Sequence, residues 1–168
     1  MVKIEHKNLF EHIFNIEFNW KTISLLAFLA IFPNIIGLAT TNVFGVKIHF
    51  FQYLIFLAAV IYGPSGGATA GAFGSVWTAV ALNNPYILVG NVILGFMVGF
   101  LFKKNVPLVL AAMLAYLIQL PWLWVTDIYL AGMPVPVVKG IVIGLLVSDL
   151  ILAIITRFTW KNIRKAIA

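Results

Sequence analysis

The stretch VPVVKGIVIGLLVSDLILAIIT, from Val135 to Thr156, decides the class of fold. A helix needs about 20 apolar residues to cross the hydrocarbon core of a bilayer, and this run is long enough. Only Lys139 and Asp149 carry a charge within it. Because a charge at membrane depth costs about 2.5–3.5 kcal/mol on insertion scales, we interpret Lys139 as a functional residue of a membrane protein.

The composition of the whole chain indicates the same class. The 168 residues are 62% hydrophobic and 10% charged, and the mean hydropathy is +1.06. A soluble domain of this length would not tolerate so much apolar surface. The net charge of +6 comes from basic residues beside apolar runs, so it indicates membrane topology rather than nucleic-acid binding. Without cysteine there is no disulfide and no thiolate metal site, and no metal or cofactor is expected.

Proline, glycine and charged residues divide the chain into six apolar runs, of which the second is short for a span. The runs are Thr22–Thr40, Ile48–Gly63, Pro64–Leu82, Pro85–Phe102, Val106–Asp127 and Val135–Thr156. The sequence therefore predicts an all-α polytopic membrane protein, with residues 22–156 forming a compact bundle of six transmembrane helices. Residues 1–21 are predicted to be a cytoplasmic amphipathic leader, and residues 157–168 a basic cytoplasmic tail.

The positions of the basic residues predict the orientation. With six spans, both termini and the second and fourth connections lie on one side of the membrane. That side carries most of the basic residues: Lys3, Lys7, Lys21, Lys103, Lys104, Arg157, Lys161, Arg164 and Lys165. The positive-inside rule then places both termini in the cytoplasm of a cell-membrane protein.

Small residues at four-residue spacing predict helix faces that approach closely. They occur in three of the predicted spans: Gly67, Gly71 and Ser75; Asn91, Gly95 and Gly99; and Gly140, Gly144 and Ser148. The pattern indicates a compact bundle but not which helices pair.

The polar residues inside the spans gather in one leaflet. At about 1.5 Å per residue, four of them fall in the outer half of their spans: Asn34, Asn91, Gln119 and Lys139. Only Asp149 falls in the inner half. This clustering predicts a ligand pocket that opens to the outer face.

The fifth span adds an aromatic face to this pocket. At about 100° per residue, one stripe of the helix holds Gln119, Trp122, Thr126 and Tyr129, with Asp127 at its edge. Aromatic rings and an amide suit a flat, partly polar ligand, and Lys139 suits an anionic group. Structural roles stay open, because aromatic residues also gather at membrane interfaces and amides also join helices. For Lys139 the alternatives are extension to the headgroups or pairing with Asp127.

Catalytic signatures are missing from the sequence. It has no paired His/Glu metal motif, no serine nucleophile elbow and no phosphate loop followed by Lys-Ser/Thr. We therefore expect a protein that is not an enzyme, for which any energy for transport comes from an ion gradient or from other subunits.

Four segments together resemble the substrate-binding S component of energy-coupling factor (ECF) transporters. They are FGVKIHFFQYL from Phe44, YGPSGG from Tyr62, GAFGS from Gly71 and GNVILGFMVG from Gly90. In that family a loop enters span two, a Gly-Pro-x-x-Gly turn leads into a glycine-rich span three, and span four ends with basic residues. Lys103 and Lys104 match that ending, and the resemblance covers roughly residues 22–156.

The resemblance implies a vitamin or micronutrient capture protein that works with a transmembrane coupling subunit and two cytoplasmic ATPases. It implies pocket residues in the outer loops and spans: Lys47, His49, Asn84, Asn91, Gln119, Trp122 and Lys139. Asn34 and Asp127 join this set from the depth and stripe arguments.

One segment departs from the pattern of the family, whose first span offers small residues at four-residue spacing to the coupling subunit. Here the small residues Ser24, Ala27 and Ala30 are spaced by three, and we take them as the corresponding partner interface. Two alternatives remain. One is a non-transporting membrane scaffold of the rod-shape-determining type. The other is a stand-alone secondary carrier, which the absence of broken-helix inverted repeats disfavours.

Overall fold

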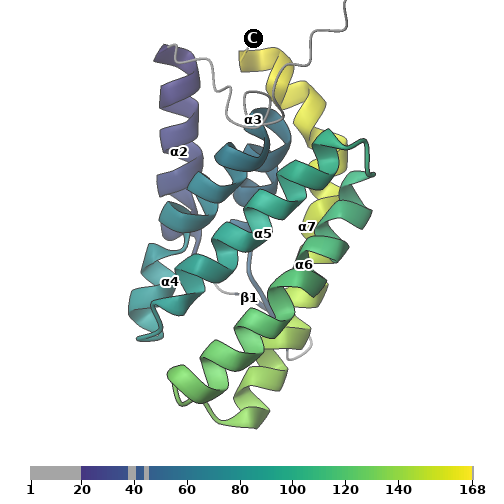
Figure 1. Cartoon of the computed structure of the whole chain (residues 1–168). Helices are drawn as coiled ribbons and strands as arrows, with labels where there is room; N and C mark the ends of the chain where they lie inside the picture. Colours follow the sequence, from purple (N-terminus) through teal and green to yellow (C-terminus); the bar gives the residue numbers. More distant parts are fainter. Residues whose placement is uncertain (1–19, 38–40, 44–45, 168) are drawn as a thin grey trace, which may run out of the picture.

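The computed structural model describes residues 20–37, 41–43 and 46–167, so nearly all of the predicted leader lies outside the described residues (Figure 1). The helices are α2 (Trp20–Gly37), α3 (Phe51–Gly74), α4 (Val76–Ala81), α5 (Tyr86–Lys103), α6 (Leu108–Val125), the π-helix η1 (Thr126–Leu130) and α7 (Val135–Ile167). The strands β1 (Thr41–Val43) and β2 (Val46–Ile48) precede α3. The residues predicted as a basic tail continue α7 as far as Ile167.

Four helical stretches are long and apolar enough to cross a membrane: Phe51–Ala81, Tyr86–Lys103, Leu108–Leu130 and Val135–Lys165. Helix α2 adds a shorter apolar segment, Ile23–Ile36. The predicted helical class is confirmed in this form, with four stretches whose length and composition suit a membrane span. The predicted second and third spans fall within one helical stretch that comprises α3 and α4, and the predicted boundary between them coincides with a break in the helix at Gly63.

Helix α3 folds back on itself at Gly63, where the backbone leaves the helical region with φ 74° and ψ −159°. A Cβ atom added to Gly66 would lie 2.9 Å from the carbonyl oxygen of Ala58, and one added to Gly67 would lie 2.8 Å from the Cβ of Ala59. Eight residues of straight helix span about 12 Å, so these approaches require the two halves of α3 to run antiparallel. Glycine is suited to this position because it adopts positive φ without steric cost.

The second half of α3 packs backbone to backbone against α5. A Cβ on Gly67 would collide with the carbonyl of Gly95, and a Cβ on Gly71 would collide with the carbonyl of Asn91. A Cβ on Gly99 would lie 2.6 Å from the backbone of Gly63. The close helix contacts predicted from small residues in these two segments are confirmed, and the structure identifies them as each other's partners. No such contact forms at Gly140, which has no neighbouring atom within 4 Å of its Cβ position in the described chain.

A short antiparallel β-hairpin connects α2 to α3, which the sequence did not predict. Thr41 pairs with Ile48, and Val43 pairs with Val46. Strand β2 contacts α7, and just after it the backbone N–H of His49 donates to Ser148 Oγ at 3.0 Å. In Figure 1, β1 is labelled part-way along the bundle, between α4 and α6. Irregular backbone at this depth is tolerated where protein satisfies its polar groups, and here the ladder and Ser148 do so.

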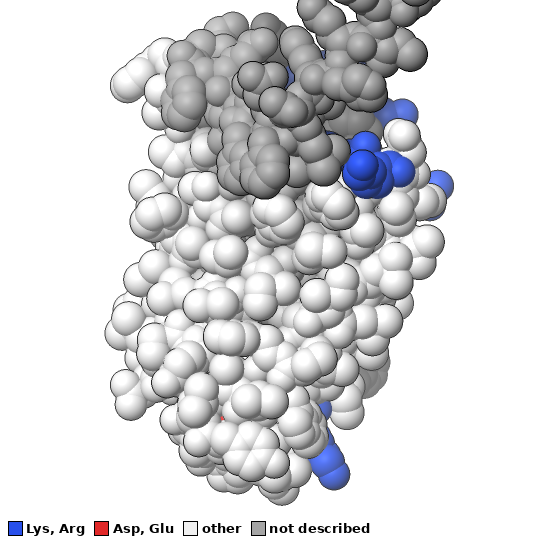
Figure 2. Space-filling view, viewed as in Figure 1, with Lys and Arg blue, Asp and Glu red and all other residues white. Residues whose placement is uncertain are grey.

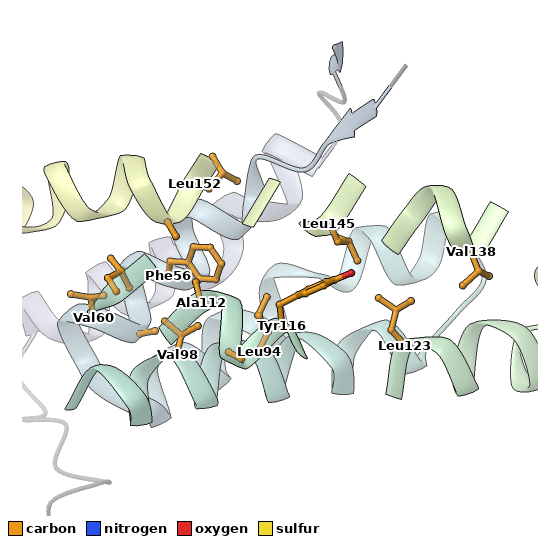
Figure 3. Close-up of a cluster of buried hydrophobic side chains, with 14 residues drawn as sticks. Phe56, Val60, Leu94, Val98, Ala112, Tyr116, Leu123, Val138, Leu145 and Leu152 are labelled. Carbon is orange, nitrogen blue, oxygen red and sulfur yellow. The ribbon is translucent and has the colours of Figure 1, made fainter. Parts of the chain in front are cut away.

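The main apolar core lies between α3, α5, α6 and α7 (Figure 3). Phe56 and Leu94 are fully buried in it, and Leu152 packs in the same cluster. Tyr116 is buried at its centre, and its hydroxyl donates to the carbonyl of Val142 at 2.7 Å. This bond fixes α6 against α7 and so positions the part of α6 that continues beyond Tyr116.

Candidate functional site

A cavity lies where the end of α6 and η1 meets the start of α5 and the first turns of α7. The lining residues are His49, Phe51, Thr78, Leu82, Tyr86, Ile87, Gly90, Asn91, Gln119, Trp122, Leu123, Thr126, Asp127, Met133, Ile141 and Leu145. The space open to the centres of water-sized spheres is about 70 Å³. A cavity of about 150 Å³ admits a benzene ring, so the space between the described walls takes part of a small ring or a comparable organic group.

Asp127 and Asn84 form the strongest polar contact at the cavity. The amide of Asn84 donates to Asp127 Oδ1 at 2.6 Å, and both side chains are buried, with 0% and 4% exposure for Asn84 and Asp127. Asn84 Oδ1 accepts the backbone N–H of Tyr86 at 3.1 Å. The pair therefore ties the end of α6 to the turn between α4 and α5, and Asn84 supports the cavity from behind its wall.

The π-helical turn η1 explains why Asp127 lies inside. Gln119, Trp122 and Thr126 line the cavity as the predicted stripe required. Tyr129, predicted on the same stripe, is 73% exposed, so that part of the prediction is wrong. A π turn holds more residues than an α turn, and the face that follows it is therefore rotated. The rotation brings Asp127 inward and turns Tyr129 outward.

The amide and indole groups of the wall are held by local hydrogen bonds. Trp122 Nε1 donates to the carbonyl of Tyr86 at 3.1 Å, which joins α6 to α5. Asn91 Nδ2 donates to the carbonyl of Ile87 at 3.1 Å. Gln119 is buried, and its Oε1 has no hydrogen-bond partner among the described residues. These bonds fix the wall before any ligand arrives, and they leave Gln119 Oε1 unsatisfied.

Gly90 makes room for these side chains. A Cβ atom at this position would lie 3.2 Å from Gln119 Nε2 and 3.4 Å from Trp122 Cδ1. A larger residue would therefore press on the amide and the indole that form the wall.

Besides Asn84, the predicted residues Asn34 and Lys139 do not line the cavity. Asn34 binds elsewhere: its Nδ2 donates to the carbonyl of Phe73 at 2.8 Å, and its Oδ1 accepts the backbone N–H of Trp77 at 2.8 Å. It therefore fastens α2 to the break between α3 and α4. Lys139 is exposed, and no ion pair joins it to Asp127 in the part of the chain that the structure describes.

The other predicted residues are distributed as follows. His49 lines the cavity, and its ring stands edge-on to Phe51 with the centroids 5.9 Å apart. The backbone of Lys47 pairs with Asn42, and its side chain lies outside the described atoms. In the predicted partner interface on α2, the described exposed residues are Ser24 and Ala27, whereas Ala30 is buried.

The sequence did not single out the apolar wall of the cavity. Tyr86 and Ile87 precede Gly90 and Asn91 by one helical turn, so the four residues share a face of α5. This spacing is the signal that could have identified them from Asn91. Met133 and Ile141 had no comparable signal, because apolar residues at such spacing more often belong to a core.

The charge of the lining is negative in the described residues. Asp127 is its carboxylate, and the lining contains no lysine or arginine. No group of three or more His, Cys, Asp or Glu side chains in the described chain could hold a metal ion. The arrangement therefore suits hydrogen bonding to an organic group, beside aromatic and aliphatic side chains that exclude water.

Comparison of the chain with models of protein families, with curated proteins and with solved structures found no match.

Proposed function

We propose that this chain is the substrate-binding S component of an ECF-type uptake transporter, which captures a vitamin or related micronutrient at the outer face of the cell membrane. The observation that carries the proposal is the cavity itself. It combines aromatic rings, amides and a carboxylate within a bundle whose apolar helices are long enough to cross a membrane. Polar groups gathered in such a cavity indicate ligand binding.

The distribution of basic residues supports an outward-facing cavity. Among the basic residues whose side chains the structure describes, all except Lys139 lie at the ends of α5 and α7 remote from the cavity: Lys103, Lys104, Arg157, Lys161, Arg164 and Lys165. Figure 2 shows lysine and arginine side chains gathered toward the upper end of the molecule. By the positive-inside rule this end faces the cytoplasm, and the cavity faces outward.

Six crossings and two cytoplasmic termini belong to the proposal. The crossings are α2, the first half of α3, the second half of α3 with α4, α5, α6 with η1, and α7. The reversal at Gly63 supports this count because it divides α3 into two antiparallel passes. The same reversal coincides with the Tyr62–Gly67 segment that resembles the turn between spans two and three of S components.

The outer face of α2 suits a contact with the coupling subunit. Ser24 and Ala27 are exposed there beside the apolar side chains of Ile23, Phe28 and Ile31. The proposed complex takes its energy from two cytoplasmic ATPases bound to the coupling subunit.

Ligand binding and association with an ATPase module test the proposal together. The full chain in detergent is heated with a panel of vitamins and nucleobases, and it is separately coexpressed with an ECF coupling subunit and its ATPases. A ligand at about 100 times its Kd adds about 2.7 kcal/mol to the free energy of unfolding, which is measurable as a rise in Tm. Trp122→Ala should abolish the rise, because it removes an aromatic wall of the cavity.

Trp77→Ala is the matched control, because Trp77 is exposed and does not line the cavity. It removes an indole of the same size, and the backbone N–H that Asn34 accepts remains. The variant should keep the ligand response. If no compound stabilises the protein and no ATPase module copurifies with it, the proposal is wrong and a membrane scaffold is the better interpretation.

A further inference from the structure

We propose that the cavity selects a flat group rich in N–H donors, neutral or positively charged, of the amidine or amino-heterocycle class. The inference rests on the proposed function, since it takes the cavity as the ligand site, and it specifies the chemistry of the ligand. Four observations carry it: the committed donors, the open acceptors, the charge and the aromatic rings of the wall.

Three donors of the described wall are already used. Trp122 Nε1 donates to the carbonyl of Tyr86 and Asn91 Nδ2 to the carbonyl of Ile87, each at 3.1 Å. The hydroxyl of Thr126 donates to the carbonyl of Trp122 at 2.8 Å. A ligand acceptor that took one of these three hydrogens would leave a backbone carbonyl without its partner.

The acceptors, in contrast, remain open. The hydrogen bond that the described residues give to the Asp127 carboxylate is the one from Asn84 to Oδ1, which leaves Oδ2 for another donor. Gln119 Oε1 is buried without a partner in the same part of the chain. A buried carboxylate oxygen and a buried amide oxygen each gain a hydrogen bond when a ligand brings N–H groups.

The charge of the wall favours the same class of ligand. Asp127 is the charged carboxylate of the described lining, and Lys139, from which an anionic ligand was expected, is exposed and lies outside the cavity wall. An anion would face the carboxylate without a described cation to compensate it, and such like-charge contacts are how sites reject ligands. A cation would be attracted.

The rings of the wall suit a planar group. Phe51, Tyr86 and Trp122 reach the cavity from α3, α5 and α6. A delocalised cation or a flat heterocycle gains from contact with aromatic faces, while its N–H edge meets the acceptors.

Two probes of the same shape and opposite charge test the inference. Benzamidine and benzoate share a phenyl ring and a planar substituent, but the first donates N–H bonds and is cationic, whereas the second only accepts and is anionic. Thermal unfolding of the full chain in detergent is measured with each, and with neutral benzamide. We expect the Tm to rise with benzamidine, to rise less with benzamide and to stay unchanged with benzoate.

Asp127→Asn assigns the preference to the carboxylate, because the variant keeps the shape of the side chain and removes its charge. Benzamidine binding should weaken about tenfold, and benzamide binding should change little. Lys139→Gln is the control and should leave every response as in the unaltered protein. If Asp127→Asn does not fold, the comparison of the three probes on the unaltered chain still tests whether the cavity prefers a cationic N–H donor.

Several outcomes would overturn the inference. Stabilisation by benzoate in preference to benzamidine would do so, and Lys47→Gln would then show whether the Lys47 side chain supplies a cation. Absence of any response to all three probes would also overturn it. Failure to bind an ATPase module, by contrast, would count against the proposed function and leave the measured preference of the cavity standing.

Discussion

The described residues include two buried carboxyl groups in apolar helices, and they differ in what surrounds them. Asp127 lies at the cavity wall and receives a 2.6 Å hydrogen bond from Asn84. Asp149 lies in the core of the bundle, and neither of its oxygens has a partner among the described residues. Residue type is the same and both side chains are buried, so the presence of a donor is what distinguishes the residue at the site from the residue in the core.

Asp149 is surrounded by apolar side chains that α7 and α3 direct into the main core. On α7 it shares a face with Leu145 and Leu152, which belong to the main core, and Figure 3 shows these two side chains directed into it. On α3, Gln52 precedes Phe56 of the same core by one turn, and both of its polar atoms are also buried without a described partner. Both polar side chains therefore enter one apolar region, where each costs free energy.

The largest expected effect comes from removing the donor to Asp127. Asn84→Leu should lower the free energy of unfolding by about 3 kcal/mol, because it leaves a buried carboxylate without its hydrogen bond. Denaturant unfolding in mixed micelles measures the change. Asn162→Leu, at an exposed position on α7, is the control and should have almost no effect. Equal stability of the two variants would remove the distinction between the two carboxyl groups.

Replacing Asp149 is expected to change the free energy of unfolding in the opposite direction. Asp149→Leu should raise the free energy of unfolding by about 2 kcal/mol, since it replaces an unpaired buried polar group with an apolar one of similar size. The same unfolding measurement applies. A loss of stability would mean that the side chain of Asp149 has a partner beyond the described residues, and the contrast with Asp127 would then disappear.

The smallest expected effects come from replacing the two buried glutamines, Gln52 and Gln119. Gln52→Leu should raise the free energy of unfolding by about 1 kcal/mol and leave ligand binding unchanged, because Gln52 does not line the cavity. Gln119→Leu should weaken the binding of an N–H donor such as benzamidine, because it removes the open acceptor of the wall. Titration of both variants with benzamidine compares them, and an equal loss of binding would contradict the assignment of the cavity wall.

The helical class, the close glycine contacts and part of the cavity wall could be predicted from the sequence. The helical membrane class follows from apolar runs that no other fold accommodates, and the glycines of α3 and α5 lie at the four-residue spacing of close helix contacts. Gln119 and Trp122 line the cavity on the predicted face because they precede η1, where α-helical geometry still holds. Asp127 was placed at the edge of that face, and it is the π turn that brings it inside.

Other residues could not be placed from the sequence. The depth of Lys139 along α7 does not determine which way its side chain points, and the core takes up the face that holds Val138 and Leu145. Asn34 lies at a depth that fits a pocket, but its neighbours there are Phe73 and Trp77. The β-hairpin has strands of three residues, too short for an alternating pattern to appear.

In the proposed topology, the reversal at Gly63 determines on which side of the membrane the later loops lie. If α3 were one straight rod, the segments from α4 onward would enter the bilayer from the opposite side, and the loops that now flank the cavity would exchange compartments with the basic ends of α5 and α7. In the proposed topology, a single backbone conformation in one glycine therefore decides which compartment each later loop reaches. The residues of α3 that precede Gly63 form too short a segment to cross a bilayer unaided, so in that topology the two halves enter the membrane as a pair.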